Sequence, residues 1–161
     1  DRHRWNRRRV RGSRVEFATM KRGRRLGVDV GDARIGVAVC DPDGLIATPV
    51  ETVAAGPDAI GRLAELVTEY EAIEVVVGLP VGLSGREGPA AAKVRDFVSL
   101  LEPAIGGVSV RLVDERLSTV SAQSQLHASG RSTKSSRSVI DQAAAVVILQ
   151  TAIDAQRARE R

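Results

Sequence analysis

The sequence has almost none of the residues that build disulfides and zinc sites. Cys40 is the only cysteine among 161 residues, which excludes an internal disulfide and any cysteine-built zinc site. A lone cysteine agrees with a reducing compartment, and we expect a cytoplasmic protein. His3 and His127 are the only histidines, so a paired-histidine metal site or a serine–histidine–aspartate triad has little support.

Long apolar runs are also missing. No stretch approaches the roughly 18–20 residues that span a bilayer, so we expect no membrane association. The first 25 residues are rich in arginine and contain no apolar stretch, which excludes a secretory signal there. Hydrophobic residues make up 43% of the chain and charged residues 27%, as in ordinary globular proteins. The length predicts one domain with short tails.

Acidic charge is scarce at one end of the chain. Residues 1–25 hold eleven basic and two acidic residues, a net charge of +9, whereas the remainder carries −5. We expect a disordered Arg-rich arm over residues 1–24, a domain over 25–157 and a tail over 158–161. A basic arm suggests a polyanionic partner. The alternative is a solvated tail without function, because Met20 could be the native start.

Hydrophobic periodicity predicts an α/β fold. Alternation of apolar residues indicates strands, and a spacing of three to four residues indicates helices. The resulting order βββαβαβαα predicts a five-stranded mixed sheet, an antiparallel meander plus parallel strands, with helices on both faces. The expected strands are 26–30, 35–40, 45–51, 73–79 and 108–112; the expected helices are 60–67 capped by Asp58, 94–101 stopped by Pro103, 119–130 and a long one after Ser138.

Asp29 stands in the middle of the first expected strand, although aspartate is depleted in strands. Gly27 and Gly31 flank it on the same face, which would leave room for a hydrated ion or another molecule's backbone. The alternative is a partly exposed aspartate that bonds to the nearby turn.

Two further acids occupy unusual places. Glu115 follows the last strand, and ligands of open α/β sheets gather at such carboxyl ends; the alternative is a solvated strand end with an ion pair to Arg116. Asp141 points from the final helix toward the core, and the alternative is a capping box that begins at Ser138. Three carboxylates without cysteine or histidine partners suit Mg²⁺ or Mn²⁺. Two such ions can promote phosphodiester hydrolysis.

Several short motifs follow one another along the chain. They are Leu26–Gly27–Val28–Asp29–Val30–Gly31, Arg34–Ile35–Gly36–Val37–Ala38, Val77–Gly78–Leu79–Pro80, Asp114–Glu115–Arg116–Leu117–Ser118–Thr119 and Ile140–Asp141–Gln142–Ala143–Ala144 through Leu149–Gln150. In this order the motifs resemble the YqgF (RuvX) family of resolvases and pre-16S rRNA nucleases, from about residue 25 to 155. The resemblance implies a ribonuclease H-like fold. It also implies that Asp29, Glu115 and Asp141 are the catalytic, metal-binding acids.

The resemblance gives four cations a role in binding nucleic acid. Arg34 and Arg116 would contact phosphates, since a guanidinium can bond two phosphate oxygens at once. Lys134 and Arg137 lie in a basic segment, expected to be a loop, that would clamp the substrate strand ahead of Asp141. The alternatives are a structural ion pair for Arg116 and a solubilising surface loop for residues 131–137.

The leading hypothesis is a metal-dependent nuclease that processes the 5′ end of pre-16S rRNA. Cleavage of a Holliday junction is the alternative within the same chemistry, and it would favour a homodimer with paired sites. A phosphotransfer enzyme is a second class, because Gly-Val-Asp-Val-Gly also resembles the phosphate loop of sugar kinases. A non-catalytic RNA- or ribosome-binding module is a third. Aromatic residues make up only 2% of the chain, so a nucleic acid would be held mainly by charge and shape.

Overall fold

One mixed sheet organises the computed structural model, which describes residues 21–117 and 134–160. Its strand order is β3-β2-β1-β4-β5. The first three strands form the predicted antiparallel meander, and β4 and β5 run parallel to β1. The predicted mixed sheet is therefore confirmed. The strands are β1 (Arg25–Val30), β2 (Arg34–Cys40), β3 (Ala47–Ala54), β4 (Glu74–Leu79) and β5 (Ser109–Asp114).

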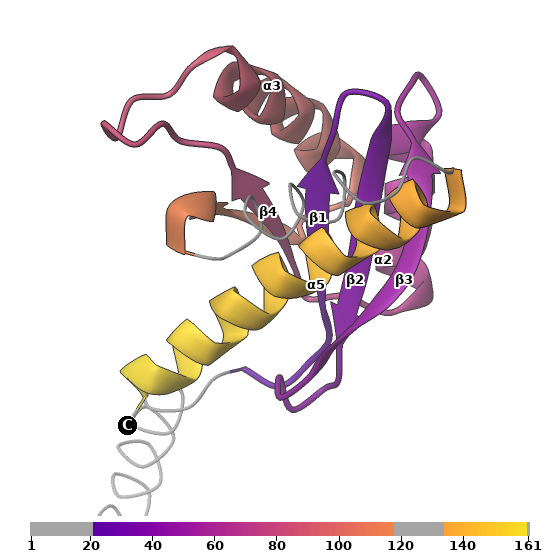
Figure 1. Ribbon diagram of the computed structural model, residues 1–161. Coiled ribbons are helices and arrows are strands. Elements are labelled where there is room, and N and C mark those ends of the chain that lie inside the picture. Colours follow the sequence, from indigo (N-terminus) through magenta and orange to yellow (C-terminus); the bar gives the residue numbers. More distant parts are fainter. Residues whose placement is uncertain (1–20, 118–133, 161) are drawn as a thin grey trace, which may run out of the picture.

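Helices cover both faces of this sheet, as predicted (Figure 1). Helices α2 (Ala59–Glu69) and α3 (Pro89–Ala104) pack on one face, and α5 (Lys134–Arg159) crosses the other. Each face has its own apolar core, the first around Leu26 and Val28 and the second around Ile148 and Leu149. Among the described helices, none is long and apolar enough to cross a membrane.

Gly27 in β1 and Gly31 directly after it make close contacts within the chain. A Cβ at Gly27 would lie 2.6 Å from the Cβ of Leu149 and 2.8 Å from the carbonyl oxygen of Ala145, so α5 fills this space. A Cβ at Gly31 would lie 2.6 Å from the carbonyl oxygen of Arg34 in the tight β1–β2 turn. The prediction that these two glycines leave room for another molecule is therefore wrong.

Helix α5 begins at Lys134, earlier than predicted. Residues 134–137 contain neither glycine nor proline, so nothing in them stops the helix from extending into the segment expected to be a loop. The capping box is therefore wrong: Ser138 lies inside the helix and Asp141 beyond its first turn, where no free backbone N–H remains. Asp58 occupies the N-cap position of α2 without a side-chain hydrogen bond, and Pro103 lies inside the last turn of α3.

Several predictions lie outside the described residues. These are the arm except for residues 21–24, the helix expected over 119–130 and the loop residues 131–133. At the near end of the arm, the Gly23 backbone N–H donates to the carbonyl oxygen of Pro42 at 2.8 Å. The chain is thus held to the β2–β3 turn just before β1 begins.

Candidate active site

Asp29 lies near the carboxyl end of the central strand β1, between two glycines of the neighbouring strands. Its antiparallel partner in β2 is Gly36. On the other side Val28 pairs with Val77, so the next residue along β4 beside Asp29 is Gly78. Because paired residues share a face of the sheet, neither neighbour presents a side chain there. Groups from elsewhere in the chain can therefore approach the Asp29 carboxylate from both sides.

Asp141 approaches from the β2 side. Its backbone carbonyl lies directly over Gly36, where any Cβ would overlap it, and the Gln142 nitrogen would lie 3.1 Å from the same Cβ. The Gln142 Nε2 donates to Thr52 Oγ1 at 3.1 Å and ties this turn of α5 to β3. The second turn of α5 is thus seated on the sheet at a place that only glycine permits.

Glu115 approaches from the β4 side. It is the first residue of the short 3₁₀ helix η1 (Glu115–Leu117), directly after β5. A Cβ at Gly78 would lie 2.8 Å from Glu115 Oε1 and 2.6 Å from Ile148 Cδ1. Glycine at this position therefore lets the Glu115 carboxylate fold back over β4 toward Asp29.

The three acids interact through their charges. Burial, together with the negative charges of Glu115 and Asp141, raises the pKa of Asp29 to about 7. Burial and the charge of Asp114 also raise the pKa of Glu115. Ionised carboxylates that lie this close together in a partly buried site repel one another. The structure therefore brings the three predicted acids together in a region with excess negative charge.

The three carboxylates lie near one another without forming a complete cation site among the described residues. Within residues 21–117 and 134–160, no three carboxylate, imidazole or thiol groups are arranged to hold one ion. Asp141 bonds elsewhere, because its Oδ2 accepts a hydrogen bond from Arg34 Nε at 2.8 Å. The predicted phosphate contact Arg34 is thus an ion-pair partner of one predicted metal ligand.

The other predicted contacts lie in η1 and at the start of α5. Arg116 donates from Nε and Nη2 to Asp114 Oδ2 at 3.0 and 2.7 Å, and this pairing lowers the pKa of Asp114. The alternative interpretation of Arg116 as an ion-pair residue thus agrees with the structure, and its phosphate contact stays a prediction. Lys134 and Arg137 belong to the first turn of α5, ahead of Asp141.

Sequence reasoning missed the role of Gly36 and Gly78. The available signal was a glycine inside each of two strands, which often marks the close approach of another part of the chain. It also missed Lys93 of α3, whose Nζ lies 2.9 Å from Oδ1 of Asp32 in the β1–β2 turn. This exposed pair joins α3 to the turn that follows Asp29.

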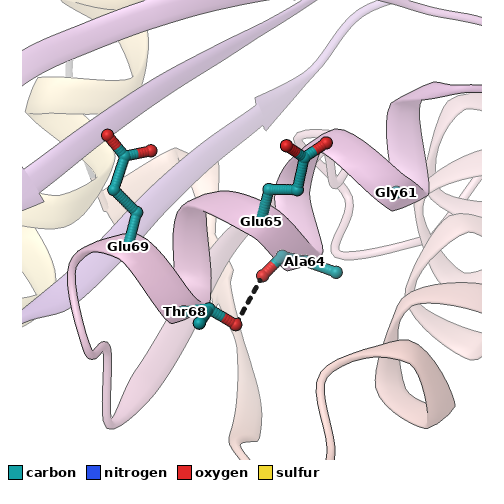
Figure 2. Close-up of a pocket in the computed structure, with 5 residues that line it drawn as sticks. All are labelled: Gly61, Ala64, Glu65, Thr68 and Glu69. Carbon is teal, nitrogen blue, oxygen red and sulfur yellow. Dashed lines mark hydrogen bonds between the residues drawn. The ribbon is translucent and has the colours of Figure 1, made fainter.

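A surface hollow of about 530 Å³ lies elsewhere on the molecule. Figure 2 shows that its lining comes from α2, where Thr68 Oγ1 donates to the carbonyl oxygen of Ala64 at 3.2 Å. Helix α2 packs on the face of the sheet opposite α5. The hollow is therefore separate from Asp29, Glu115 and Asp141. Gly61, Glu65 and Glu69 complete its lining.

The sheet order and the acid-bearing end of β1 define a ribonuclease H-like α/β domain. The fold is similar to that of Thermus thermophilus RuvC in complex with a Holliday junction substrate, with a TM-score of 0.55 and 20% sequence identity. That similarity covers 84% of this chain and 96% of the RuvC chain. A second Thermus thermophilus RuvC structure matches over the same shares with a TM-score of 0.51.

Sequence comparison identifies a family within this class of α/β domains. Residues 23–155 match the family model RuvX, described as Holliday junction resolvase. A Streptomyces coelicolor protein named "Putative pre-16S rRNA nuclease" is 64% identical over 144 residues, which are 88% of this chain and 86% of that protein. A Mycobacterium leprae protein of the same name is 57% identical over 140 residues, 86% of this chain and 76% of its own length. The chain belongs to the RuvX family.

Proposed function

We propose that this protein is a nuclease that hydrolyses phosphodiester bonds of nucleic acid, and that its substrate is the 5′ end of pre-16S rRNA. Membership of the RuvX family and the names of its relatives support hydrolysis of nucleic acid. The rRNA substrate is taken from the names of these relatives, which match this chain over most of their own length. Work on ribosomal RNA would place the protein in the cytoplasm.

The observation that carries this proposal is that Asp29, Glu115 and Asp141 lie close together at one end of the sheet. Their oxygen ligands fit Mg²⁺ or Mn²⁺, because hard divalent cations prefer carboxylates. The raised pKa of Asp29 supports the fit, since a cation would offset the repulsion that contributes to the shift. Bound by these residues, such ions would supply activation of water and stabilisation of the leaving oxygen.

The protein's own residues position the acids and bind the substrate. Gly36 and Gly78 allow α5 and Glu115 to approach Asp29, so the folded sheet holds the acids near one another before substrate arrives. Arg34, Arg116, Lys134 and Arg137 are proposed to bind backbone phosphates, which are recognised well by guanidinium and ammonium groups. Binding through charge requires no base stacking and fits a chain with 2% aromatic residues.

Holliday junction cleavage is the second candidate. The description of the matching family model favours it. A four-way junction needs two symmetric cuts, so this function predicts a two-fold homodimer with one site in each protomer. Sedimentation velocity in the presence of a junction would reveal such a dimer.

A cleavage assay tests the proposal. Labelled pre-16S 5′ leader RNA and a synthetic four-way DNA junction are incubated with Mn²⁺, using wild type, Asp29→Asn and the exposed control Asp96→Asn. We expect cleavage of the RNA by wild type and the control, and none by Asp29→Asn or in EDTA. Cleavage of the junction alone would establish the second candidate. Binding without cleavage in all three proteins would favour a non-catalytic module.

A further inference from the structure

Arg34 and Asp141 are held against each other by their backbones. The carbonyl oxygen of Arg34 accepts a hydrogen bond from the Gly31 N–H at 2.9 Å, which fixes the start of β2. The backbone of Asp141 rests on Gly36, two residues further along the same strand. The resulting ion pair joins residues that are 107 positions apart in the sequence.

This ion pair is accessible rather than locked in the core. The Arg34 side chain is 34% exposed and the Asp141 side chain 21% exposed. Among the described residues, Arg34 bonds through Nε, and no other partner of the Asp141 carboxylate is present. The contact can therefore break without disturbing either apolar core, since neither side chain belongs to one.

A guanidinium at this place opposes a cation at the same carboxylate. Arg34 neutralises Asp141 and takes one of its oxygens. A unit positive charge about 6 Å from a divalent ion weakens binding roughly tenfold even at the dielectric constant of water, and more strongly in a partly buried site. The effect acts most directly on Asp141, because the guanidinium is bonded to that carboxylate.

We propose that Arg34 competes with the divalent cation for the Asp141 carboxylate, so that Asp29 and Glu115 bind the cation first and Asp141 joins them when Arg34 is displaced. This inference rests on the metal site of the proposed function. It accounts for the absence of a complete three-acid cation site among the described residues while Asp141 is bonded to Arg34. The displaced guanidinium would then be free to bind phosphate.

Manganese titrations of Arg34 variants test the competition directly. The dissociation constant of Mn²⁺ is measured by electron paramagnetic resonance of the free ion, without substrate. Arg34→Met removes the charge at similar length, and we expect Mn²⁺ to bind at least about tenfold more tightly. Arg34→Lys keeps the charge and should stay close to wild type. Arg62→Met breaks a comparable pair between α2 and Glu51 of β3 and should leave Mn²⁺ affinity unchanged.

A spectroscopic measurement on wild type gives a second, independent readout. In ¹⁵N-labelled protein, the Arg34 Nε–H signal reports the hydrogen bond to Asp141, and saturating Mg²⁺ should move it to the position of a solvated arginine. Arg34→Lys assigns that signal by removing it. An unmoved signal at saturation would overturn the proposal.

Other outcomes separate this inference from the proposed function. If Arg34→Met weakens Mn²⁺ binding, Arg34 orients Asp141 as a supporting hydrogen-bond donor and the competition is wrong. If its affinity equals that of wild type, the arginine has no influence on the cation and the proposal also fails. Equal, weak Mn²⁺ binding by wild type and Asp29→Asn would instead overturn the metal site itself.

Discussion

Replacing Asp29 by Asn should make the protein more stable at alkaline pH while destroying its activity. The pKa of Asp29 is raised from 3.8 to about 7. Since one pKa unit corresponds to about 1.4 kcal/mol, the ionised carboxylate destabilises the fold by about 4 kcal/mol above pH 7. The neutral amide removes this penalty, but an imperfectly bonded amide costs about 2 kcal/mol, so we expect a net gain of about 2 kcal/mol.

The gain should depend on pH in a defined direction. The folded protein holds the Asp29 proton more tightly than the unfolded chain, so the stability of the wild type falls as pH rises from about 4 to 7. The amide of the Asp29→Asn variant does not titrate. At pH 5 the wild-type carboxyl is largely protonated, and the variant should show no advantage. The difference between the two proteins should therefore appear between pH 5 and pH 8.

Divalent cations should reverse the order of stability. A ligand that binds only the folded state stabilises it in proportion to the logarithm of its concentration over the dissociation constant. We expect Mn²⁺ at pH 8 to stabilise wild type and to leave Asp29→Asn nearly unchanged. Urea unfolding followed by circular dichroism, at pH 5 and 8 in EDTA or Mn²⁺, measures all these differences. Asp96→Asn, at an exposed position of α3, is the matched control.

One result would refute this reasoning. If Asp29→Asn is less stable than wild type at pH 8 in EDTA, the Asp29 carboxylate is stabilised by the fold rather than repelled. The aspartate would then be a structural residue, and its pKa would not be raised in the folded protein. A gain of equal size at pH 5 and pH 8 would show that the amide improves packing and that charge is not the cause.

Three further substitutions address the contacts around Asp29. Gly36→Ala places a Cβ on the Asp141 carbonyl, so α5 must shift; we expect a loss of about 3 kcal/mol in urea unfolding and loss of cleavage. Gly78→Ala should displace the Glu115 carboxylate and reduce Mn²⁺ affinity in a titration, whereas Gly88→Ala, with open space around its Cβ, should leave Mn²⁺ affinity unchanged. Arg116→Ala should weaken RNA binding in a salt-dependent anisotropy assay with little effect on stability, since the Asp114 pair is exposed.

The sheet could be predicted because its pattern is local. Residues 26–30 and 35–40 alternate clearly, and the turn at residues 31–34 connects them directly. The register then fixes that Asp29 faces α5, since Leu26 and Val28 occupy the opposite core. The acids were detectable because each stands where its residue type is unusual for its surroundings.

The close contacts could not be predicted in the same way. The sequence pattern does not indicate that Gly36 lies under the Asp141 backbone, because this contact depends on how closely α5 packs on the sheet. The ion pair between Arg34 and Asp141 joins distant segments of the chain and depends on the same close packing of α5. The predicted start of α5 was wrong because Ser138 and Asp141 satisfy a local capping rule that the continuing helix makes irrelevant.

The position of α5 connects folding to the chemistry of the site. Ala145, Ile148 and Leu149 of this helix are buried against the sheet, and their burial stabilises the fold by several kcal/mol, at roughly 25 cal/mol per Å² of apolar surface. The same docking brings the Asp141 charge toward Asp29, which adds to the effect of burial in raising the pKa of Asp29 and destabilises its ionised state. The burial of these apolar side chains of α5 therefore offsets the repulsion that Asp141 creates. Substitutions that loosen Leu149 should lower cleavage and the pKa of Asp29 together, although Leu149 touches neither cation nor substrate.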